Sequence, residues 1–380
     1  MTTDKHNKRP NVPPLRFPEF SGEWEKHLTT DFFEFKNGLN PDVKRFGSGT
    51  KFISVMDILN NRYITYDKII SSVEAKDDDL RDFGVNYGDI LFQRSSETLE
   101  DVGRANVYLD EKPALFGGFV IRGKRIGDYN PLFFRYLLSS PSVRKRIIVK
   151  GAGAQHFNIG QDGLSKVSLF VPSAKEQDRI AQLLNAIDKR IEVQSGLIEK
   201  LESLIGGIIE RLTAQYPNVR IADCLECHSS TLQENQLNET GGYRVYGANG
   251  ICGYTDSPGI NGDAILIVKD GSGVGNVSYA IGEYSVIGTS NYLTAKNGYS
   301  LRYLYYILKK FNFAPYKTGM AIPHIYFKDY GRAMVYCPSF EEQERIAKKL
   351  SKIERKIEIE RSIKDCCIAQ KQYLLQQMFI

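Results

Sequence analysis

The 380-residue sequence lacks the features that several classes of protein require. It contains no run of about 18 apolar residues, so we expect no membrane-spanning helix. Residues 1–14 are polar and proline-rich, without the apolar core of a secretory signal. Six cysteines in a chain of this length predict reduced thiols in the cytoplasm, not a disulfide framework. We therefore expect a cytoplasmic protein that does not bind a membrane.

Motifs that would support catalysis are also missing. The glycine-rich segment 271–275 lies between two strand-like runs, so it predicts a hairpin loop and not a phosphate-binding loop before a helix. Cys224 and Cys227 form one CxxC step, whereas a structural zinc site needs four ligands. The segment 130–133, Asn-Pro-Leu-Phe, differs from the Asn-Pro-Pro-Tyr/Phe motif of adenine methyltransferases, because Leu132 replaces the second proline. No cofactor-binding motif accompanies it. We expect no catalytic residue, no metal site and no cofactor on this chain.

The chain contains an internal repeat. Segments 172–181 and 338–347 share the pattern Pro-Ser-x-x-Glu-Gln-x-Arg-Ile-Ala at an offset of 166 residues. Upstream of each copy lies an aromatic helix-like stretch, residues 131–138 and 300–308. The offset is too long for the unit of a solenoid, so it indicates duplication of a whole domain followed by a long helix.

Apolar residues after each repeated segment recur at steps of three and four, which is typical of a helix that packs along another helix. We expect the two helices to pair antiparallel within the chain; packing on their own domains and dimerisation are the alternatives. In the second helix Glu360, Lys364 and Lys371 occupy positions where apolar residues are expected, which suggests a register shift. The predicted inter-helix seam consists of Ile180, Leu184, Ile187, Ile191, Ile198, Leu201, Ile205, Ile208 and Leu212, with Ile346, Leu350, Ile353 and Ile357.

These patterns predict an α+β protein in which two duplicated mixed α/β domains are separated by two long antiparallel coiled-coil helices, related by a pseudo-twofold axis. The expected segments are a first domain at 1–172, a central helix at 173–213, a second domain at 214–338 and a final helix at 339–380.

The net charge of +5 is too small to identify a partner, but the basic residues are unevenly distributed. Acidic residues are absent between Asp128 and Asp162 and again between Glu283 and Asp329, at corresponding places in the two halves. Such windows can neutralise phosphates, although a single one is usually a solvated face. The phosphate contacts predicted on this basis are Arg135, Arg144, Lys145, Arg146, Lys150, Lys296, Arg302, Lys309, Lys310, Lys317 and Lys328.

Each basic window precedes or includes a polar loop, residues 151–158 and 318–324. Gln and Asn can bond adenine in bidentate fashion, and Arg and Lys favour guanine. An ordinary surface loop is the alternative for each. The predicted base-reading residues are Gln93, Arg94, Arg104, Gln155, His156, Asn158, Asn249, Lys269, Ser272 and His324.

The sequence resembles the specificity subunits of type I restriction–modification systems over essentially its whole length. The duplicated Glu-Gln-x-Arg-Ile-Ala is the most specific part of the resemblance. The other segments that carry it are Pro14–Phe20 with Trp24, Tyr246–Tyr254 and Gly262–Gly275.

The resemblance implies two target-recognition domains that each read one half of a bipartite site in double-stranded DNA. It also implies two methyltransferase subunits that bind S-adenosylmethionine, and two restriction or motor subunits that use ATP and magnesium. The less regular seam of the second helix leaves its docking surface for partners less defined. A coiled-coil scaffold that joins two protein-binding domains is the main rival hypothesis. A self-contained methyltransferase is the third, weakened by the missing cofactor motifs.

Overall fold

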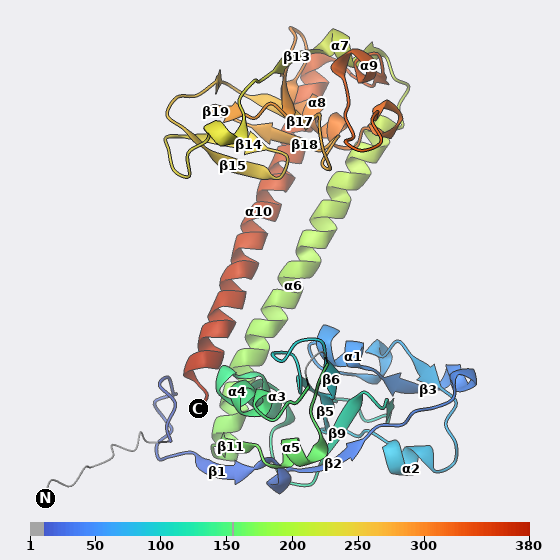
Figure 1. Cartoon of the computed structure of the whole chain (residues 1–380), viewed down its shortest axis with the longest axis vertical. Helices are drawn as coiled ribbons and strands as arrows, with labels where there is room; N and C mark the ends of the chain where they lie inside the picture. Colours follow the sequence, from blue (N-terminus) through green and yellow to red (C-terminus); the bar gives the residue numbers. More distant parts are fainter. Residues whose placement is uncertain (1–10, 154–155) are drawn as a thin grey trace, which may run out of the picture. The chain divides into compact units, whose positions relative to one another are not determined.

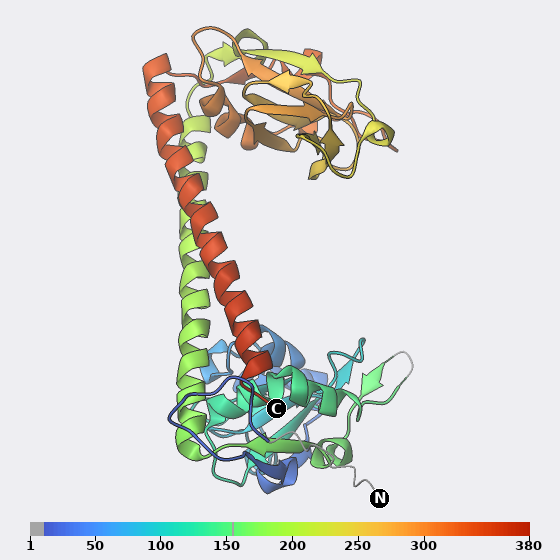
Figure 2. The same ribbon diagram turned by 90° about the vertical axis from the view of Figure 1, so that its left-hand side faces the viewer.

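The computed structural model describes residues 11–153 and 156–380. These residues form two compact units: unit 1 takes the chain up to Gln194 together with Ile363–Ile380, and unit 2 is Ser195–Ser362. Each unit contains parts of two long helices, α6 (Ala174–Thr213) and α10 (Phe340–Gln377). Both are single uninterrupted helices in Figure 1 and Figure 2. No helix of the described residues is long and apolar enough to cross a membrane.

Both units are built on a four-stranded antiparallel sheet of the same topology. The strand of this sheet that comes last in the sequence lies between the two that come first. In unit 1 the order is β2 (Phe33–Asn37), β9 (Val120–Arg125), β5 (Ile90–Gln93) and β7 (Ala105–Val107). In unit 2 it is β13 (Leu225–Ser229), β20 (Ser290–Ala295), β17 (Ala264–Val268) and β18 (Val277–Ala280). The shared topology confirms the predicted duplication, and the β17–β18 pairing confirms the hairpin around residues 271–275.

A second sheet in each unit combines one parallel and one antiparallel neighbour. In unit 1, β3 (Phe46–Ile53) pairs with β4 (Ser72–Val73) and, in parallel, with β8 (Leu115–Phe116). In unit 2, β14 (Tyr243–Gly247) pairs with β15 (Gly250–Thr255) and, in parallel, with β19 (Glu283–Val286). The other edge of β19 pairs antiparallel with β16 (Ile260–Asn261).

Short strand pairs lead into the long helices. In unit 1, β1 (Glu25–Leu28) pairs with β11 (Ser168–Val171), which precedes α6. In unit 2, β12 (Val219–Arg220) pairs with β21 (Met334–Val335), which precedes α10. The shorter helices are α1 (Val55–Asn60), α2 (Asp79–Phe83), α3 (Pro131–Ser139), α4 (Pro141–Ile148), α5 (Gln161–Ser165), α7 (Ile221–Cys224), α8 (Leu301–Lys309) and α9 (Phe327–Tyr330).

Each aromatic helix lies where the sequence predicts it. Asn130 and Ser300 cap α3 and α8 by accepting hydrogen bonds from the backbone N–H three residues later, which is the usual role of such residues at a helix start. Both helices bury aromatic side chains against the four-stranded sheet, Phe133 and Phe134 in unit 1 and Tyr303 and Tyr306 in unit 2.

The long helices pack both on each other and on the sheets of their units. In unit 1 the core that contains Ile180 and Leu184 of α6 also contains Leu374 of α10. In unit 2 Ile209 of α6 and Leu350 of α10 share the second core. The start of α6 therefore meets the end of α10 in unit 1, and the reverse holds in unit 2, as expected for an antiparallel pair.

The burial of the predicted seam residues reflects packing of the helices both on each other and on the sheets. Ile209 is buried although the seam assigned that place to Ile208, which is half-buried. Ile180, Leu184, Ile187, Ile198, Leu350 and Ile357 are buried, and the other predicted seam residues are half-buried. The predicted segment boundaries at 172, 213 and 338 remain predictions, because the compact units divide both helices.

Candidate nucleic-acid interface

Both polar loops are closed by the same pair of backbone hydrogen bonds. In unit 1, Ala152 and Asn158 exchange two backbone hydrogen bonds of 2.9 and 2.8 Å. In unit 2, Thr318 and His324 do the same at 2.9 and 2.8 Å. The second residue of each hairpin is a glycine with positive φ, 140° at Gly153 and 87° at Gly319. Other residues rarely adopt this conformation, so glycine is needed for the turn.

Each hairpin packs on the loop that follows the central strand of the sheet. In unit 1, β10 (Phe157–Asn158) pairs with β6 (Ser95–Ser96), and Figure 2 shows these segments side by side. The N–H of Ile159 donates to the carbonyl oxygen of Arg94 at 3.0 Å.

The same bond recurs in unit 2. The N–H of Ile325 donates to the carbonyl oxygen of Lys269 at 2.9 Å. Gly271 adds a bond from its N–H to the carbonyl oxygen of Pro323, also 2.9 Å. Arg94 and Lys269 therefore occupy equivalent places, as do Asn158 and His324, and four predicted base-reading residues form two matching pairs.

The remaining predicted base-reading residues lie around these pairs. His156, Ser272 and Asn249 are exposed, and the turn that holds Asn249 lines a cavity with Gly275 and Asn276. Arg104 is exposed and pairs with Asp101 at 2.6 Å. Gln155 lies outside the described residues.

Gln93 departs from its predicted role. Its side chain is buried, and its Nε2 donates to the carbonyl oxygen of Ser95 at 2.9 Å. All four residues of β5 are buried, because this central strand is covered on both faces. Gln93 therefore stabilises the loop through this bond. Its burial does not favour a contact with a DNA base.

About half of the predicted phosphate contacts are bonded inside the protein. Arg144 donates to the carbonyl oxygens of Glu100 and Val102 at 2.8 and 2.7 Å, and burial together with the charge of Arg104 lowers its pKa to about 10. Arg146 donates to the carbonyl oxygen of Ser168 at 3.2 Å. The others bonded in this way are Arg135, Lys296, Arg302 and Lys309.

Five lysines from the two windows are exposed and have no ion pair with the described residues. They are Lys145, Lys150, Lys310, Lys317 and Lys328, and Lys328 lies 5.2 Å from the ring centre of Tyr326. These lysines stay predicted phosphate contacts, while the internally bonded arginines, Lys296 and Lys309 stabilise the fold.

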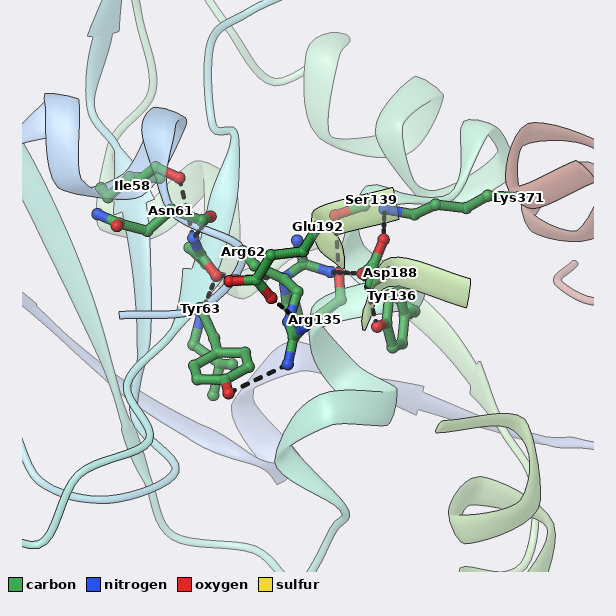
Figure 3. Close-up of polar contacts among 12 residues, drawn as sticks. Ile58, Asn61, Arg62, Tyr63, Arg135, Tyr136, Ser139, Asp188, Glu192 and Lys371 are labelled. Atoms are coloured by element: carbon green, nitrogen blue, oxygen red, sulfur yellow. Dashed lines mark hydrogen bonds and ion pairs between the residues drawn. The ribbon is translucent and has the colours of Figure 1, made fainter. Parts of the chain in front are cut away.

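Three of these internally bonded residues, Arg135, Arg302 and Lys309, contact one acidic residue in each unit. Asp188 of α6 has a 6% exposed side chain and contacts Arg135 at 3.3 Å and Lys371 at 2.6 Å. It also accepts a 2.8 Å bond from the hydroxyl of Tyr136. Figure 3 shows these groups around the carboxylate. Lys371, which interrupts the predicted seam, thus has a charged partner on the facing helix.

Unit 2 repeats this arrangement on α10. Glu354 lies 166 residues after Asp188 and accepts a 2.8 Å bond from the hydroxyl of Tyr306. It pairs with Arg302 at 2.7 Å and with Lys309 at 3.4 Å. Asp188 is buried and the side chain of Glu354 is 20% exposed, and carboxylates withdrawn from water need several donors to offset their lost hydration, which explains this convergence. Sequence reasoning missed both acids, although the repeat offset relates them.

The glutamine of the repeated Glu-Gln pair joins each long helix to its sheet domain. Gln177 accepts a bond from the N–H of Asn130 at 3.0 Å and donates to the carbonyl oxygen of Pro172 at 3.0 Å. Gln343 makes the same two bonds with Ser300 and Pro338, both 2.9 Å. The motif therefore fixes the start of each long helix to the cap of the aromatic helix.

The preceding glutamates differ between the units. Glu176 is buried and accepts two 2.7 Å bonds from Arg16, and Trp24 Nε1 lies 3.3 Å from it. Glu342 pairs with Arg345 on the surface instead. The Arg16 and Trp24 contacts explain why the Pro14–Phe20 segment and Trp24 belong to the recognisable part of the sequence.

No group of three or more His, Cys, Asp or Glu side chains in the described part of the chain could hold a metal ion. Cys224, Cys227 and the four other cysteines are free thiols.

The sequence profile of the type I restriction modification DNA specificity domain matches residues 21–203 and 215–366. The chain belongs to this family. The MjaX type I restriction enzyme specificity subunit of Methanocaldococcus jannaschii is 24% identical, covering 94% of this chain and 93% of its own length. The EcoKI specificity subunit of Escherichia coli K12 is 26% identical over 48% of this chain and 42% of its own length.

Solved structures share the fold of the specificity subunit. The S subunit of M. genitalium superposes with a TM-score of 0.68 at 19% identity, covering 97% of this chain and 99% of that one. A second chain, from work on assembly of a type I system, has a TM-score of 0.53 at 14% identity, with 95% and 98% covered. The chain is thus a non-catalytic DNA-recognition subunit, whose partners are DNA and the other subunits of such a complex.

Proposed function

We propose that this specificity subunit reads a bipartite site in double-stranded DNA, one half with each unit. The observation that carries the proposal is the pair of equivalent loop assemblies, in which Arg94 with Asn158 and Lys269 with His324 occupy matching places. Hairpins of this size fit the major groove, where side chains distinguish all four base pairs. Two readers in one chain then require a target with two specific halves.

Each unit contains one DNA-reading domain, here called a reader. Phosphate contacts from the exposed lysines would fix each reader on the duplex. Lys145 and Lys150 follow α3 in unit 1, and Lys310 and Lys317 follow α8 in unit 2. Such contacts add affinity for any sequence and orient the loops, while the loop side chains select the bases. The small net charge is compatible with this role because the contacts are local.

We further propose that two methyltransferase subunits, which carry S-adenosylmethionine, methylate an adenine in each half-site. Two restriction or motor subunits, which use ATP and magnesium, would join for cleavage in the cytoplasm, and no cofactor resides on this chain. The long helices retain exposed apolar side chains that could receive partner subunits: Val193 and Tyr373 in unit 1, and Leu204 and Ile359 in unit 2.

The test is to reconstitute the chain with its methyltransferase subunit and map methylated adenines across a genome. Two short specific sequences separated by a fixed gap are expected. A variant with Lys269→Ala and His324→Ala should relax one half of the motif, and Asn158→Ala should relax only the other.

Absence of methylation by a well-assembled complex would contradict the proposal and favour a protein scaffold. Methylation by this chain without partners would favour the self-contained enzyme. Relaxation of both halves by a variant in one unit would contradict the assignment of one half to each unit.

A further inference from the structure

The hairpin of unit 2 carries two exposed apolar side chains at its tip. Met320 is 104% exposed, the highest value among large apolar residues of the described chain, and Ile322 is 65% exposed. Exposed apolar side chains occur singly on any surface, but two at one loop tip leave an apolar patch without a partner. Neither residue belongs to the core of unit 2.

The tip is held in place from both sides. The backbone pair of Thr318 and His324 closes the hairpin, and Pro323 accepts the bond from Gly271. At Gly319 a Cβ atom would lie 2.4 Å from the carbonyl oxygen of Ile322, so the turn admits only glycine without rearrangement. The apolar pair is therefore presented on a defined backbone.

Polar and charged residues lie next to this patch in the two loops. Lys317 precedes the hairpin, while Lys269, Asp270 and Ser272 come from the adjoining loop, where Asp270 forms a backbone bridge with His324. An apolar protein pocket would leave these cations without partners. The major groove of DNA instead combines phosphates at its edges with one apolar group on its floor, the C5-methyl of thymine.

The corresponding positions of the first hairpin differ. At the repeat offset, Met320 and Ile322 replace Ala154 and His156. The two loops thus share the backbone pairing that closes them but differ in sequence at these positions, as expected if they recognise different base sequences.

We propose that Met320 and Ile322 contact thymine C5-methyl groups in the major groove of the half-site read by unit 2. The inference rests on the proposed function, because it assigns a role to residues of the same loop assembly. It requires that this half-site contain at least one specified A·T pair.

The test replaces each thymine of that half-site by deoxyuridine, which removes only the methyl group. Binding by the complex of this chain with its methyltransferase subunit is then measured. Loss of one buried methyl is expected to weaken binding by about 4-fold, or about 0.8 kcal/mol. In the double variant Met320→Ala, Ile322→Ala the thymine and deoxyuridine duplexes should bind equally, both more weakly than thymine DNA binds the unmodified complex.

Ile281→Ala is the matched control. Ile281 is 68% exposed and lies between β18 and β19, at the end of β17 opposite to the Lys269 loop. It should keep both the affinity and the deoxyuridine effect.

The inference is overturned if deoxyuridine changes nothing at any thymine of the half-site. It is also overturned if the double variant retains the full deoxyuridine effect. Loss of affinity in that variant with no effect of deoxyuridine would point to insertion between bases or to a protein contact. In all of these cases site-specific methylation persists, whereas failure of the proposed function abolishes it.

Discussion

The duplicated glutamines allow the junction between each long helix and its sheet domain to be tested one unit at a time. Gln177 is 4% exposed and Gln343 is 1% exposed. Each side chain satisfies one backbone N–H and one backbone carbonyl oxygen. Methionine has a similar length and apolar stem but cannot replace either bond, so Gln177→Met and Gln343→Met remove the bonds without a large cavity.

The expected cost follows from the number of groups left without partners. One buried polar group without a hydrogen bond costs about 1–3 kcal/mol, so two such groups cost about 2–4 kcal/mol after partial relaxation. A tenfold change in an equilibrium corresponds to about 1.4 kcal/mol, which gives about 30-fold to about 700-fold easier local opening. A single free energy for the whole chain is unsuitable, because two compact units need not unfold together.

Hydrogen exchange measured by peptide mass spectrometry resolves the two junctions. Gln177→Met should accelerate exchange at the start of α3 and leave the start of α8 unchanged, and Gln343→Met should do the opposite. Gln182→Met, at an exposed position of α6, is the control and should change neither. Equal acceleration in both units, or unchanged exchange at Asn130 in Gln177→Met, would refute the assigned role.

Three further predictions follow from the described contacts. Lys145→Ala and Lys310→Ala should weaken binding to all DNA sequences and each lower the slope of log affinity against log salt by about 0.9, as measured in salt titrations; an unchanged slope would contradict phosphate contact. Burial, together with the bond to Glu354, raises the pKa of Tyr306 to about 12, so the folded state holds this proton more tightly than the unfolded state, whose pKa is 10.0. The free energy of unfolding of unit 2 should therefore fall as pH rises from 10 to 12, and less steeply in Tyr306→Phe; an identical slope in alkaline denaturation would contradict this. Iodoacetamide should label the exposed Cys252 and Cys366 before the buried Cys224 and Cys337, and mass spectrometry that finds the reverse order would contradict the described burial.

The architecture was predictable because it follows from local patterns. The repeat at 172–181 and 338–347 predicted two domains with two helices, and heptad spacing predicted helix packing. The turn at residues 271–275 followed from glycines between apolar runs. The helix and turn depend on residues near one another in the sequence, and the repeat is read by comparing two short segments.

The role of individual charged residues was not predictable in the same way. Arg135 and Lys309 lie in windows free of acidic residues, yet their partners, Asp188 and Glu354, come from 53 and 45 residues away in the sequence. Gln93 follows the same principle, because its burial depends on what covers β5. A linear count of charge cannot reveal such pairings, although the common offset of Asp188 and Glu354 was a usable signal.

The two glutamine junctions also bear on how new specificities can arise. Each reader offers its long helix the same pair of backbone groups, an N–H at the cap of the aromatic helix and a proline carbonyl. A foreign domain that ends in the same Pro-Ser and carries the same cap would form the same two hydrogen bonds with the glutamine of the long helix. Recombination within the repeated codons could therefore exchange one reader, or transpose the two, without any new contact having to evolve at the joint.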